Sequence, residues 1–293
     1  MYIIIGANGY LGSYFIKNIL QYYEEQIIAV ARYKGQSYGK CVEWVEYDIT
    51  DSQAIETFNS QYLKKNTNNK ILFLAAYHNP DLVEQNPKLA WDINVTALSN
   101  FLNCADNVKR LFYPSTDSVY GNGDVKYKFK ETDMLHPVNM YGLHKTVAEK
   151  LVTAYGYNVV RYPFLIGPSL IPKRKHFYDV IAESLLAGKK VDMLADSYRS
   201  TLSFDTVSRL TIELMEREND VPQILNVCGD KAYSKYDVGL MIADKLCVSR
   251  DLIVPISMAD SKAFFTTKRA SSTVMDNSLL KSILGYEFID FEL

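Results

Sequence analysis

The chain has 293 residues, of which 48% are hydrophobic, and its formal net charge is −2. This length allows a sizeable core in one large domain or two. The small net charge gives no electrostatic case for nucleic acid or an acidic membrane surface as partner. The densest basic run, Lys173–Arg174–Lys175, is interpreted as a solvated loop.

The cysteines and the N-terminus bear on the cellular compartment. Cysteines stand at positions 41, 104, 228 and 247, without the spacing of a disulfide framework or of paired metal ligands. We therefore expect buried thiols, a reducing compartment and no bound metal. The first strand starts at Tyr2, which leaves no room for a signal peptide, and no apolar run is long enough to cross a bilayer. Together these features predict a soluble, cytoplasmic protein.

Strands and helices alternate along the first half of the chain. Strands are predicted at residues 3–5, 27–31, 42–47, 71–76, 111–113 and 159–161, and helices at 10–23, 52–64 and 87–106. This order predicts an α/β fold, a Rossmann-type doubly wound parallel sheet with helices on both faces. We assign residues 1–165 to this nucleotide-binding domain, to which later segments return. The more varied residues 166–293 are assigned mainly to a smaller C-terminal substrate-binding lobe.

A glycine turn follows the first strand, with the sequence Gly6–Ala7–Asn8–Gly9–Tyr10–Leu11–Gly12. Gly6 permits the tight turn, Gly9 leaves room for a pyrophosphate, and Gly12 lets the helix pack close to the strand. The N-terminus of the helix offers unpaired N–H groups and a positive dipole end to phosphates. A glycine pattern alone can be a simple turn, but this one lies between a strand and a helix. It therefore predicts dinucleotide binding.

The end of the second strand bears on the choice of dinucleotide. Proteins of this fold that bind NAD place an acidic residue there for the ribose 2′-hydroxyl. This chain has Ala31 followed by Arg32, whose guanidinium is available for a 2′-phosphate. We expect NADP, with NAD as the alternative if Arg32 is merely exposed.

Tyr141 and Lys145 are four residues apart, so they share one face of a predicted helix. A nearby ammonium favours phenolate and lowers the tyrosine pKa from about 10 toward the range of an acid–base catalyst. An earlier strand ends at Ser115–Thr116–Asp117, where the Thr116 hydroxyl would point into the ligand crevice of the sheet. Thr116 would then hydrogen-bond the substrate oxygen that Tyr141 protonates; the alternative is a turn hydroxyl.

These motifs resemble the extended short-chain dehydrogenase/reductases, and specifically their dTDP-4-dehydrorhamnose reductase-like branch. The resemblance covers nearly the whole chain and includes Asp48–Ile49 at the adenine pocket and the run from Arg161 to Pro168 beside the nicotinamide. It implies an enzyme that binds NADP or NAD. The cofactor-binding residues that it implies are Gly6, Asn8, Gly9, Tyr10, Leu11, Gly12, Arg32, Asp48, Ile49, Ala75, Ala76, Tyr77, Asn94, Tyr141, Lys145 and Pro163.

The resemblance also implies the reaction, the reduction of a nucleotide-linked keto-deoxysugar. Tyr141 would give a proton to the keto oxygen while the nicotinamide delivers hydride, Lys145 would bind the nicotinamide ribose, and Thr116 would position the oxygen. The substrate-binding residues that it implies are His78, Thr116, Asp117, Arg199 and Arg269. Arg199 lies in a stretch that resembles the one whose arginine binds the pyrophosphate in the family, and a guanidinium fork suits paired phosphate oxygens. Arg269 stands where the reductases carry an Arg–Pro pair, although Ala270 replaces the proline here. The alternative for each arginine is a surface residue or a salt-bridge partner.

The residues after Thr116 help to distinguish this reaction from other reactions of the family. Sugar-nucleotide 4,6-dehydratases carry a glutamate at the position of Ser118, and the epimerase-reductases that make GDP-fucose carry a cysteine there, so both are disfavoured. A 4-epimerase remains an alternative, as does a non-catalytic dinucleotide-binding regulatory subunit. The intact Thr116, Tyr141 and Lys145 favour catalysis. The nucleotide, the sugar and the carbon that is reduced do not follow from the sequence.

A second apolar face on the helix of Tyr141 bears on quaternary structure. It consists of Leu143, Val147, Leu151 and Ala154. Together with the helix at 87–106, this face would either meet a partner in a homodimer or pack inside the monomer.

Overall fold

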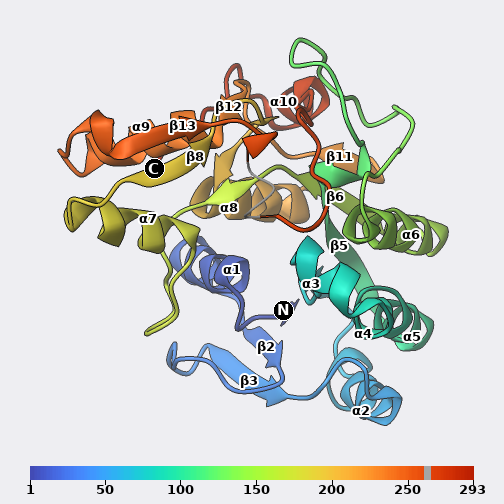
Figure 1. Ribbon diagram of the computed structural model, residues 1–293. Helices are drawn as coiled ribbons and strands as arrows, with labels where there is room; N and C mark the ends of the chain where they lie inside the picture. Colours follow the sequence, from blue (N-terminus) through green and yellow to red (C-terminus); the bar gives the residue numbers. More distant parts are fainter. Residues whose placement is uncertain (261–264) are drawn as a thin grey trace.

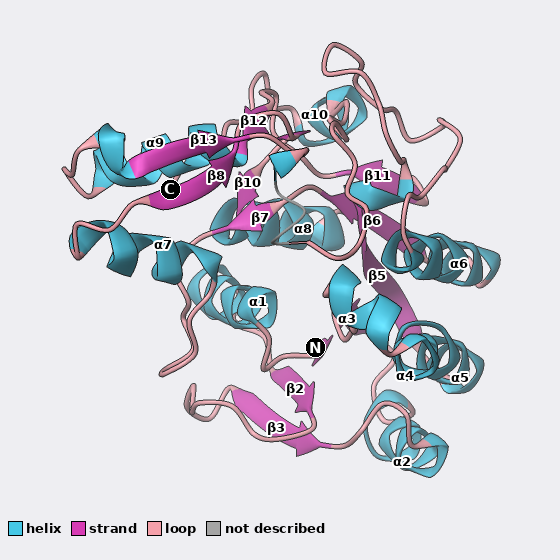
Figure 2. Ribbon diagram, in the orientation of Figure 1, coloured by secondary structure: helices cyan, strands magenta, loops and turns pink. Residues whose placement is uncertain are grey.

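A seven-stranded sheet forms the centre of the computed structural model, which describes residues 1–260 and 265–293 (Figures 1 and 2). All neighbouring strands run parallel, in the order β11-β6-β5-β4-β1-β2-β3. The strands are β1 (Tyr2–Ile5), β2 (Ile27–Ala31), β3 (Val42–Glu46), β4 (Asn69–Phe73), β5 (Val108–Thr116), β6 (Asn158–Tyr162) and β11 (Ile224–Asn226). The strand order reverses between β1 and β4, which places a ligand crevice at their carboxyl ends. The predicted Rossmann-type α/β fold is confirmed.

Helices cover both faces of this sheet (Figure 1). One face is covered by α2 (Ser52–Phe58), α4 (Pro87–Trp91), α5 (Ala97–Cys104) and α6 (Met140–Ala154). A π-helical turn, Asp92–Thr96, joins α4 to α5, so residues 87–104 form the long helical stretch that the sequence predicts. A similar turn, Asn59–Leu63, extends α2. Phe58, Phe101 and Val152 are among the buried residues of this layer.

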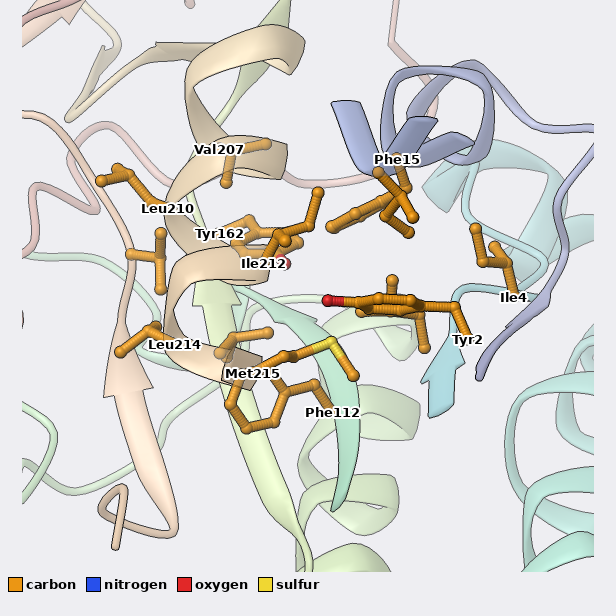
Figure 3. Packing of buried hydrophobic residues seen from close by; sticks show 14 of the residues in the cluster. Tyr2, Ile4, Phe15, Phe112, Tyr162, Val207, Leu210, Ile212, Leu214 and Met215 are labelled. Atoms are coloured by element: carbon orange, nitrogen blue, oxygen red, sulfur yellow. The ribbon is translucent and has the colours of Figure 1, made fainter. Parts of the chain in front are cut away.

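The other face of the sheet is covered by α1 (Tyr10–Tyr22), α8 (Phe204–Glu216) and α10 (Ser278–Leu284). Figure 3 shows Phe15 of α1 and Val207 of α8 in the same apolar cluster as the strand residues Ile4 and Phe112. Ser203 caps α8 by accepting a hydrogen bond from the backbone N–H of Thr206. Two of these helices and strand β11 come from the second half of the chain, so late segments complete the sheet and its cover.

The remaining segments form a smaller lobe beside the carboxyl ends of the strands (Figure 1). Here α7 (Phe177–Leu186) and α9 (Lys235–Lys245) share an apolar core with the parallel pair β8 (Val191–Leu194) and β13 (Ile253–Ile256). Two short pairs adjoin them, β7 (Leu165–Ile166) with β10 (Leu202–Ser203) and β9 (Tyr198–Arg199) with β12 (Tyr233–Ser234). Short helices are α3 (Pro80–Gln85) and the 3₁₀ turns Asp117–Val119 and Arg250–Leu252. Within the described ranges, no helix is both long and apolar enough to span a membrane.

A buried ion pair fastens α6 to the sheet. Glu149 of α6 accepts hydrogen bonds from Nε and Nη2 of Arg161 on β6, at 3.0 and 2.7 Å. Ser115 Oγ donates to the same carboxylate at 2.5 Å, and Arg161 Nη1 donates to the Tyr120 hydroxyl at 2.8 Å. Both charged side chains are 2% exposed. These bonds fix the helix that carries the predicted catalytic tyrosine and lysine relative to β5 and β6.

Candidate functional site

The turn between β1 and α1 has the close packing that the glycine pattern predicts. Gly6 has a φ of +93°, and a Cβ on it would lie 2.7 Å from the backbone nitrogen of Ala75. A Cβ on Gly12 would lie 2.6 Å from the carbonyl oxygen of Ala7. A Cβ on Gly9 would meet only the Gly6 carbonyl oxygen within 4 Å of the described chain. The N-cap residue of α1, Gly9, has no side chain that could cap the helix, and the first turn of α1 holds no acid. This helix end can therefore bind an anion.

A cleft of about 390 Å³ opens beside the turn, and we call it the first cleft. Its walls contain nine of the predicted cofactor-binding residues, Gly6, Asn8, Gly9, Arg32, Asp48, Ile49, Ala75, Ala76 and Tyr77. At Asp48, burial opposes ionisation, but hydrogen bonds from Thr50 and the charge of Arg32 outweigh it and lower the pKa of the carboxyl. Arg32 follows the last residue of β2, is exposed, and lines the first cleft. As the sequence predicts, an arginine and not an acidic residue stands at this position.

The other seven predicted cofactor-binding residues do not line the first cleft: Tyr10, Leu11 and Gly12 belong to α1, Tyr141 and Lys145 to α6, and Asn94 and Pro163 lie elsewhere. Asn94 is 2% exposed and stands behind the first cleft, where its Oδ1 accepts from the backbone N–H of Tyr77 at 2.7 Å. Its Nδ2 donates to the Tyr77 carbonyl at 3.0 Å, so Asn94 fixes the backbone of a cleft residue. Pro163 lies in a second cleft, described below. His78, predicted to bind substrate, lies in the wall of the first cleft instead.

Arg174 also lines the first cleft, although the sequence predicts only a solvated loop there. It belongs to an exposed loop, as expected, but its Nη1 donates to the carbonyl of Asn8 at 3.0 Å. Its guanidinium also lies 4.7 Å from the ring centroid of Tyr10, whose hydroxyl donates to the Lys175 carbonyl at 2.6 Å. Leu11, in α1, packs against the core of the sheet. The loop thus contacts the glycine turn from the other half of the chain. In the sequence, only its positive charge could have indicated a role at the cleft.

Helix α6 carries Tyr141 and Lys145 one turn apart, as predicted. The Lys145 ammonium is buried and donates to the hydroxyl of Tyr113 at 2.9 Å and to the carbonyl of Pro114 at 2.7 Å. Both acceptors lie on β5, which ends at Thr116. The helix therefore brings Tyr141 and Lys145 next to the strand end that carries the predicted threonine.

Thr116 ends β5 and begins the 3₁₀ turn Asp117–Val119. Its Oγ1 accepts from the backbone N–H of Ser118 at 3.2 Å and lies 3.1 Å from Oδ1 of Asp117. A Cβ on Gly142 would lie 2.8 Å from the Ser118 carbonyl oxygen, so the first turn of α6 packs directly on this turn. The three predicted catalytic residues are thus held together by β5 and α6.

The pKa shifts of Lys145 and Tyr141 differ from those that the sequence predicts. Burial lowers the pKa of Lys145 to about 7, although the charge of Glu149 opposes the shift. Burial and the charge of Asp117 raise the pKa of Tyr141 above its ordinary value. The expectation that Lys145 shifts Tyr141 toward phenolate is therefore wrong for this structure, because the ammonium is directed to β5 while a carboxylate acts on the phenol. At neutral pH the Tyr141 hydroxyl keeps its proton.

A second cleft, of about 210 Å³, is lined by residues of both the sheet and the lobe. Five predicted residues line it, Thr116, Asp117, Pro163, Arg199 and Arg269. Seven further residues of its lining are not predicted as substrate-binding by the sequence, Ser118, Phe164, Leu194, Ser197, Tyr233, Lys235 and Phe265. Of these, Ser118 bears only on the choice of reaction, and Phe164 lies in the run expected beside the nicotinamide. Most of these come from short elements of the lobe that carry no recognisable motif, so only the fold brings them to the cleft.

Arg199 is bound by protein acceptors on several sides. Its Nε lies 3.2 Å from Oδ2 of the buried Asp117, which also accepts from Thr273 Oγ1 at 2.5 Å. Nη1 of Arg199 donates to the Tyr198 carbonyl at 2.7 Å, and Nη2 donates to the Ala270 carbonyl at 2.8 Å. Most of its donors are therefore committed to the walls of the second cleft.

Arg269 bridges the lobe and the sheet domain. Its Nη2 donates to Oδ2 of Asp81, in the first turn of α3, at 2.8 Å. Its Nη1 donates to the Thr267 carbonyl at 3.1 Å, and Asp81 Oδ1 accepts from the Thr267 backbone N–H at 2.9 Å. Asp81 thus holds the segment that contains Arg269 over the second cleft.

Comparison with known proteins gives a match over the full chain. The family model described as RmlD substrate binding domain matches residues 1–293. The dTDP-4-dehydrorhamnose reductase of Aggregatibacter actinomycetemcomitans is 23% identical over 303 aligned residues, covering 99% of this chain and 95% of the relative. Methionine adenosyltransferase 2 subunit beta of Xenopus laevis is 26% identical over 193 residues. That alignment covers 64% of this chain and 57% of the relative, little more than half of its length.

Two solved structures share the fold. One is dTDP-4-dehydrorhamnose reductase from Bacillus anthracis in complex with NADP, with a TM-score of 0.78, 18% identity, and coverage of 99% of this chain and 94% of that chain. The other is UDP-glucuronic acid 4-epimerase from Bacillus cereus in complex with UDP-glucuronic acid and NAD. Its TM-score is 0.80 at 17% identity, and it covers 99% of this chain and 94% of that chain. At these identities the likeness concerns the fold.

Proposed function

Because the chain belongs to the RmlD substrate-binding family, we propose that it is an NAD(P)-dependent reductase of a nucleotide-linked keto-deoxysugar. The family agrees with the predicted resemblance to the dTDP-4-dehydrorhamnose reductase-like branch. One observation carries the proposal: α6 carries Tyr141 and Lys145 next to the end of β5, where Thr116 lines the second cleft, although Tyr141 and Lys145 themselves line neither cleft. Lys145 acts electrostatically on His78 in the wall of the first cleft, and Thr116 lines the second.

The first cleft fits a dinucleotide. The uncapped N-terminus of α1 and the open side of Gly9 suit a pyrophosphate, and the wall formed by Asp48 and Ile49 suits an adenosine. NADP or NAD supplies the hydride when it is bound there. We favour NADP because Arg32 stands where NAD-binding proteins of this fold carry an acid. NAD is the alternative, and the two structural relatives were solved with one cofactor each.

In this proposal the proton comes from Tyr141. Its raised pKa keeps the hydroxyl protonated at neutral pH, so the group can act as general acid toward a keto oxygen. The Thr116 hydroxyl, at the wall of the second cleft, would hydrogen-bond the same oxygen and orient the carbonyl. Lys145 would bind the nicotinamide ribose while its contacts with β5 fix the distance between helix and strand.

The reaction is tested by NADPH and NADH oxidation against a panel of dTDP-, UDP-, GDP- and CDP-linked 4-keto sugars. In Tyr141→Phe the ring remains but the proton is lost, so we expect kcat to fall by about 10²–10⁴ while NADPH binding stays nearly unchanged. Tyr155→Phe, the same change just beyond the other end of α6, is the matched control and should keep wild-type kcat. A Tyr141→Phe rate within threefold of wild type would remove Tyr141 as the acid.

Two other functions each have one observation in their favour. The Xenopus laevis relative is by its name a subunit of another enzyme, which favours a dinucleotide-binding regulatory subunit. The Bacillus cereus structure is an epimerase, which favours a nucleotide-sugar 4-epimerase. The same panel separates them, because a regulatory subunit would bind NADPH without oxidising it. An epimerase would convert a nucleotide sugar to its 4-epimer without net consumption of the cofactor.

We also propose a cytoplasmic homodimer. The described cysteines are all free thiols, which suits a reducing compartment, but Cys41 and Cys247 are exposed and not buried as expected. Leu143 of α6 and Trp91 of α4 are 42% and 41% exposed and offer apolar surface to a partner, whereas Leu151 packs against the core of the monomer. Sedimentation that detects only a 33.4 kDa species at micromolar concentration would reject the dimer.

A further inference from the structure

Three cationic side chains line the second cleft, and they differ in how far the protein already neutralises them. Arg199 is paired with the carboxylate of Asp117, and Arg269 with that of Asp81. Lys235 has neither an ion pair nor a hydrogen bond to its ammonium within residues 1–260 and 265–293. The cleft therefore holds a surplus positive charge, and that charge resides on Lys235.

The surroundings of the Lys235 ammonium contain aromatic rings in place of an anion. Its Nζ lies 5.5 Å from the ring centroid of Phe164 and 5.2 Å from those of Phe177 and Phe265. Cation–π contacts hold an ammonium in place but leave its hydrogen-bond donors unused. Lys235 also lines an adjoining cavity of about 170 Å³, so its side chain borders both the second cleft and this cavity.

The position of Lys235 is unfavourable for the free protein. It is the first residue of α9, where the helix dipole repels a positive charge. Asp237 in the same turn is used in capping and accepts from Ser234 N and Oγ at 2.8 and 2.7 Å. Burial and the charges of Arg199 and Arg269 lower the pKa of Lys235 to about 8. A cation kept at such a cost to stability is typical of a ligand site.

We propose that Lys235 binds the diphosphate of the substrate, and that Arg199 and Arg269 serve mainly to hold the walls of the second cleft. This assignment rests on the proposed function, since it takes a nucleotide-linked substrate as given. It changes the expectation from sequence, in which Arg199 binds the diphosphate and Arg269 is a further substrate-binding residue. The ammonium supplies the unused donors, and a diphosphate supplies the missing negative charge.

The test is isothermal titration of UDP and of dTDP into the full chain. Lys235→Met and Lys235→Gln should each weaken both ligands at least tenfold, because a charge-assisted hydrogen bond is lost. The matched control is Lys190→Met, an exposed lysine just before β8 in the same lobe, which should bind within twofold of wild type. Affinities of both Lys235 variants within twofold of wild type would overturn the proposal.

A second measurement uses the wild-type protein and does not depend on how the variants fold. A bound anion raises the pKa of Lys235 from about 8, so binding of UDP at pH 8 should take up protons. Titrations in Tris and in HEPES, which differ in ionisation enthalpy, report this uptake. In the part of the chain that the structure describes, the charged groups that share these two cavities with Lys235 are Arg199, Arg269 and Asp117 in the second cleft and Asp192 in the adjoining cavity. Absence of proton uptake would also overturn the proposal.

Two further experiments distinguish binding of the diphosphate by Lys235 from binding of a sugar carboxylate, and from failure of the proposed reaction. If Lys235→Met keeps UDP affinity but weakens UDP-glucuronic acid relative to UDP-glucose, the lysine binds a sugar carboxylate and the diphosphate assignment is wrong. Tyr141→Phe should bind UDP as wild type does. If no keto sugar is reduced and UDP binding still depends on Lys235, the proposed reaction fails while the diphosphate site stands.

Discussion

Removal of the acidic partner from the buried Glu149–Arg161 pair should strongly destabilise the protein. In Glu149→Ala, Arg161 keeps its bonds to the Tyr120 hydroxyl and the Glu131 carbonyl but loses both bonds to the carboxylate. The Arg161 side chain is 2% exposed, so water cannot replace the carboxylate. Breaking a buried pair in this way costs about 3–5 kcal/mol. We expect the free energy of unfolding to fall by about that amount.

The double variant Glu149→Ala/Arg161→Met should lose less stability than either Glu149→Ala or Arg161→Met alone. No buried charge remains in it, and Tyr120 keeps its hydrogen bond to Asn226. The hydroxyl of Ser115 loses its acceptor, which costs about 1–3 kcal/mol. The difference between the double variant and the sum of the singles measures the coupling of the two charges.

Urea unfolding followed by circular dichroism measures all four proteins. The exposed pair Arg250–Asp244 has similar two-bond geometry, at 2.7 and 2.6 Å, and provides the control. Asp244→Ala should unfold close to the wild-type urea midpoint, because exposed pairs contribute little. The reasoning is refuted if Glu149→Ala costs less than about 1 kcal/mol or if the two single effects are additive.

Three further predictions concern the first cleft and its surroundings. Arg32→Ala should weaken NADPH binding about ten- to a hundredfold and leave NADH binding nearly unchanged in fluorescence titrations, since only NADPH carries the 2′-phosphate; equal effects on both would make Arg32 structural. Gly12→Ala should lower stability by about 1–3 kcal/mol in thermal unfolding, because its Cβ would lie 2.6 Å from the Ala7 carbonyl oxygen, and an unchanged midpoint would contradict that packing. Burial lowers the pKa of His176 to about 4, so the unfolded chain binds a proton that the folded one does not, and stability is lost as pH falls from about 6.5 to 4. His176→Phe should lose less stability over that range, whereas parallel decreases in urea midpoint would show that His176 is not responsible.

The parts of the site that the sequence predicts are those encoded by neighbouring residues. The glycine turn is a local pattern between a strand and a helix, and Tyr141 and Lys145 are one helical turn apart. Thr116 follows from the end of a strand, and Arg32 from the absence of an acid at the end of another. In each case a few consecutive residues determine the local structure. They also determine that the functional side chain lies at the crevice of the sheet.

The parts that the sequence does not predict depend on contacts between distant segments. Arg269 and its partner Asp81 are 188 residues apart, and no local pattern indicates that they meet. The same holds for Arg174, which reaches the glycine turn from 166 residues away. The expected effect of Lys145 on Tyr141 failed for a similar reason. Their spacing fixes a shared helix face, but the direction of the ammonium depends on acceptors that β5 provides.

The late segments that cover the sheet have a consequence for biosynthesis. A ribosome releases the strands β1 to β6 before α8, whose residues Val207 and Leu210 belong to the same apolar cluster as Ile4 and Phe112 (Figure 3). Until residue 216 has left the exit tunnel, that face of the nascent sheet is covered by α1 alone, and β6 lacks its neighbour β11. An unfinished chain thus exposes an apolar surface and an unpaired strand edge. Chaperones bind such surfaces, and chains that expose them aggregate when synthesis stalls.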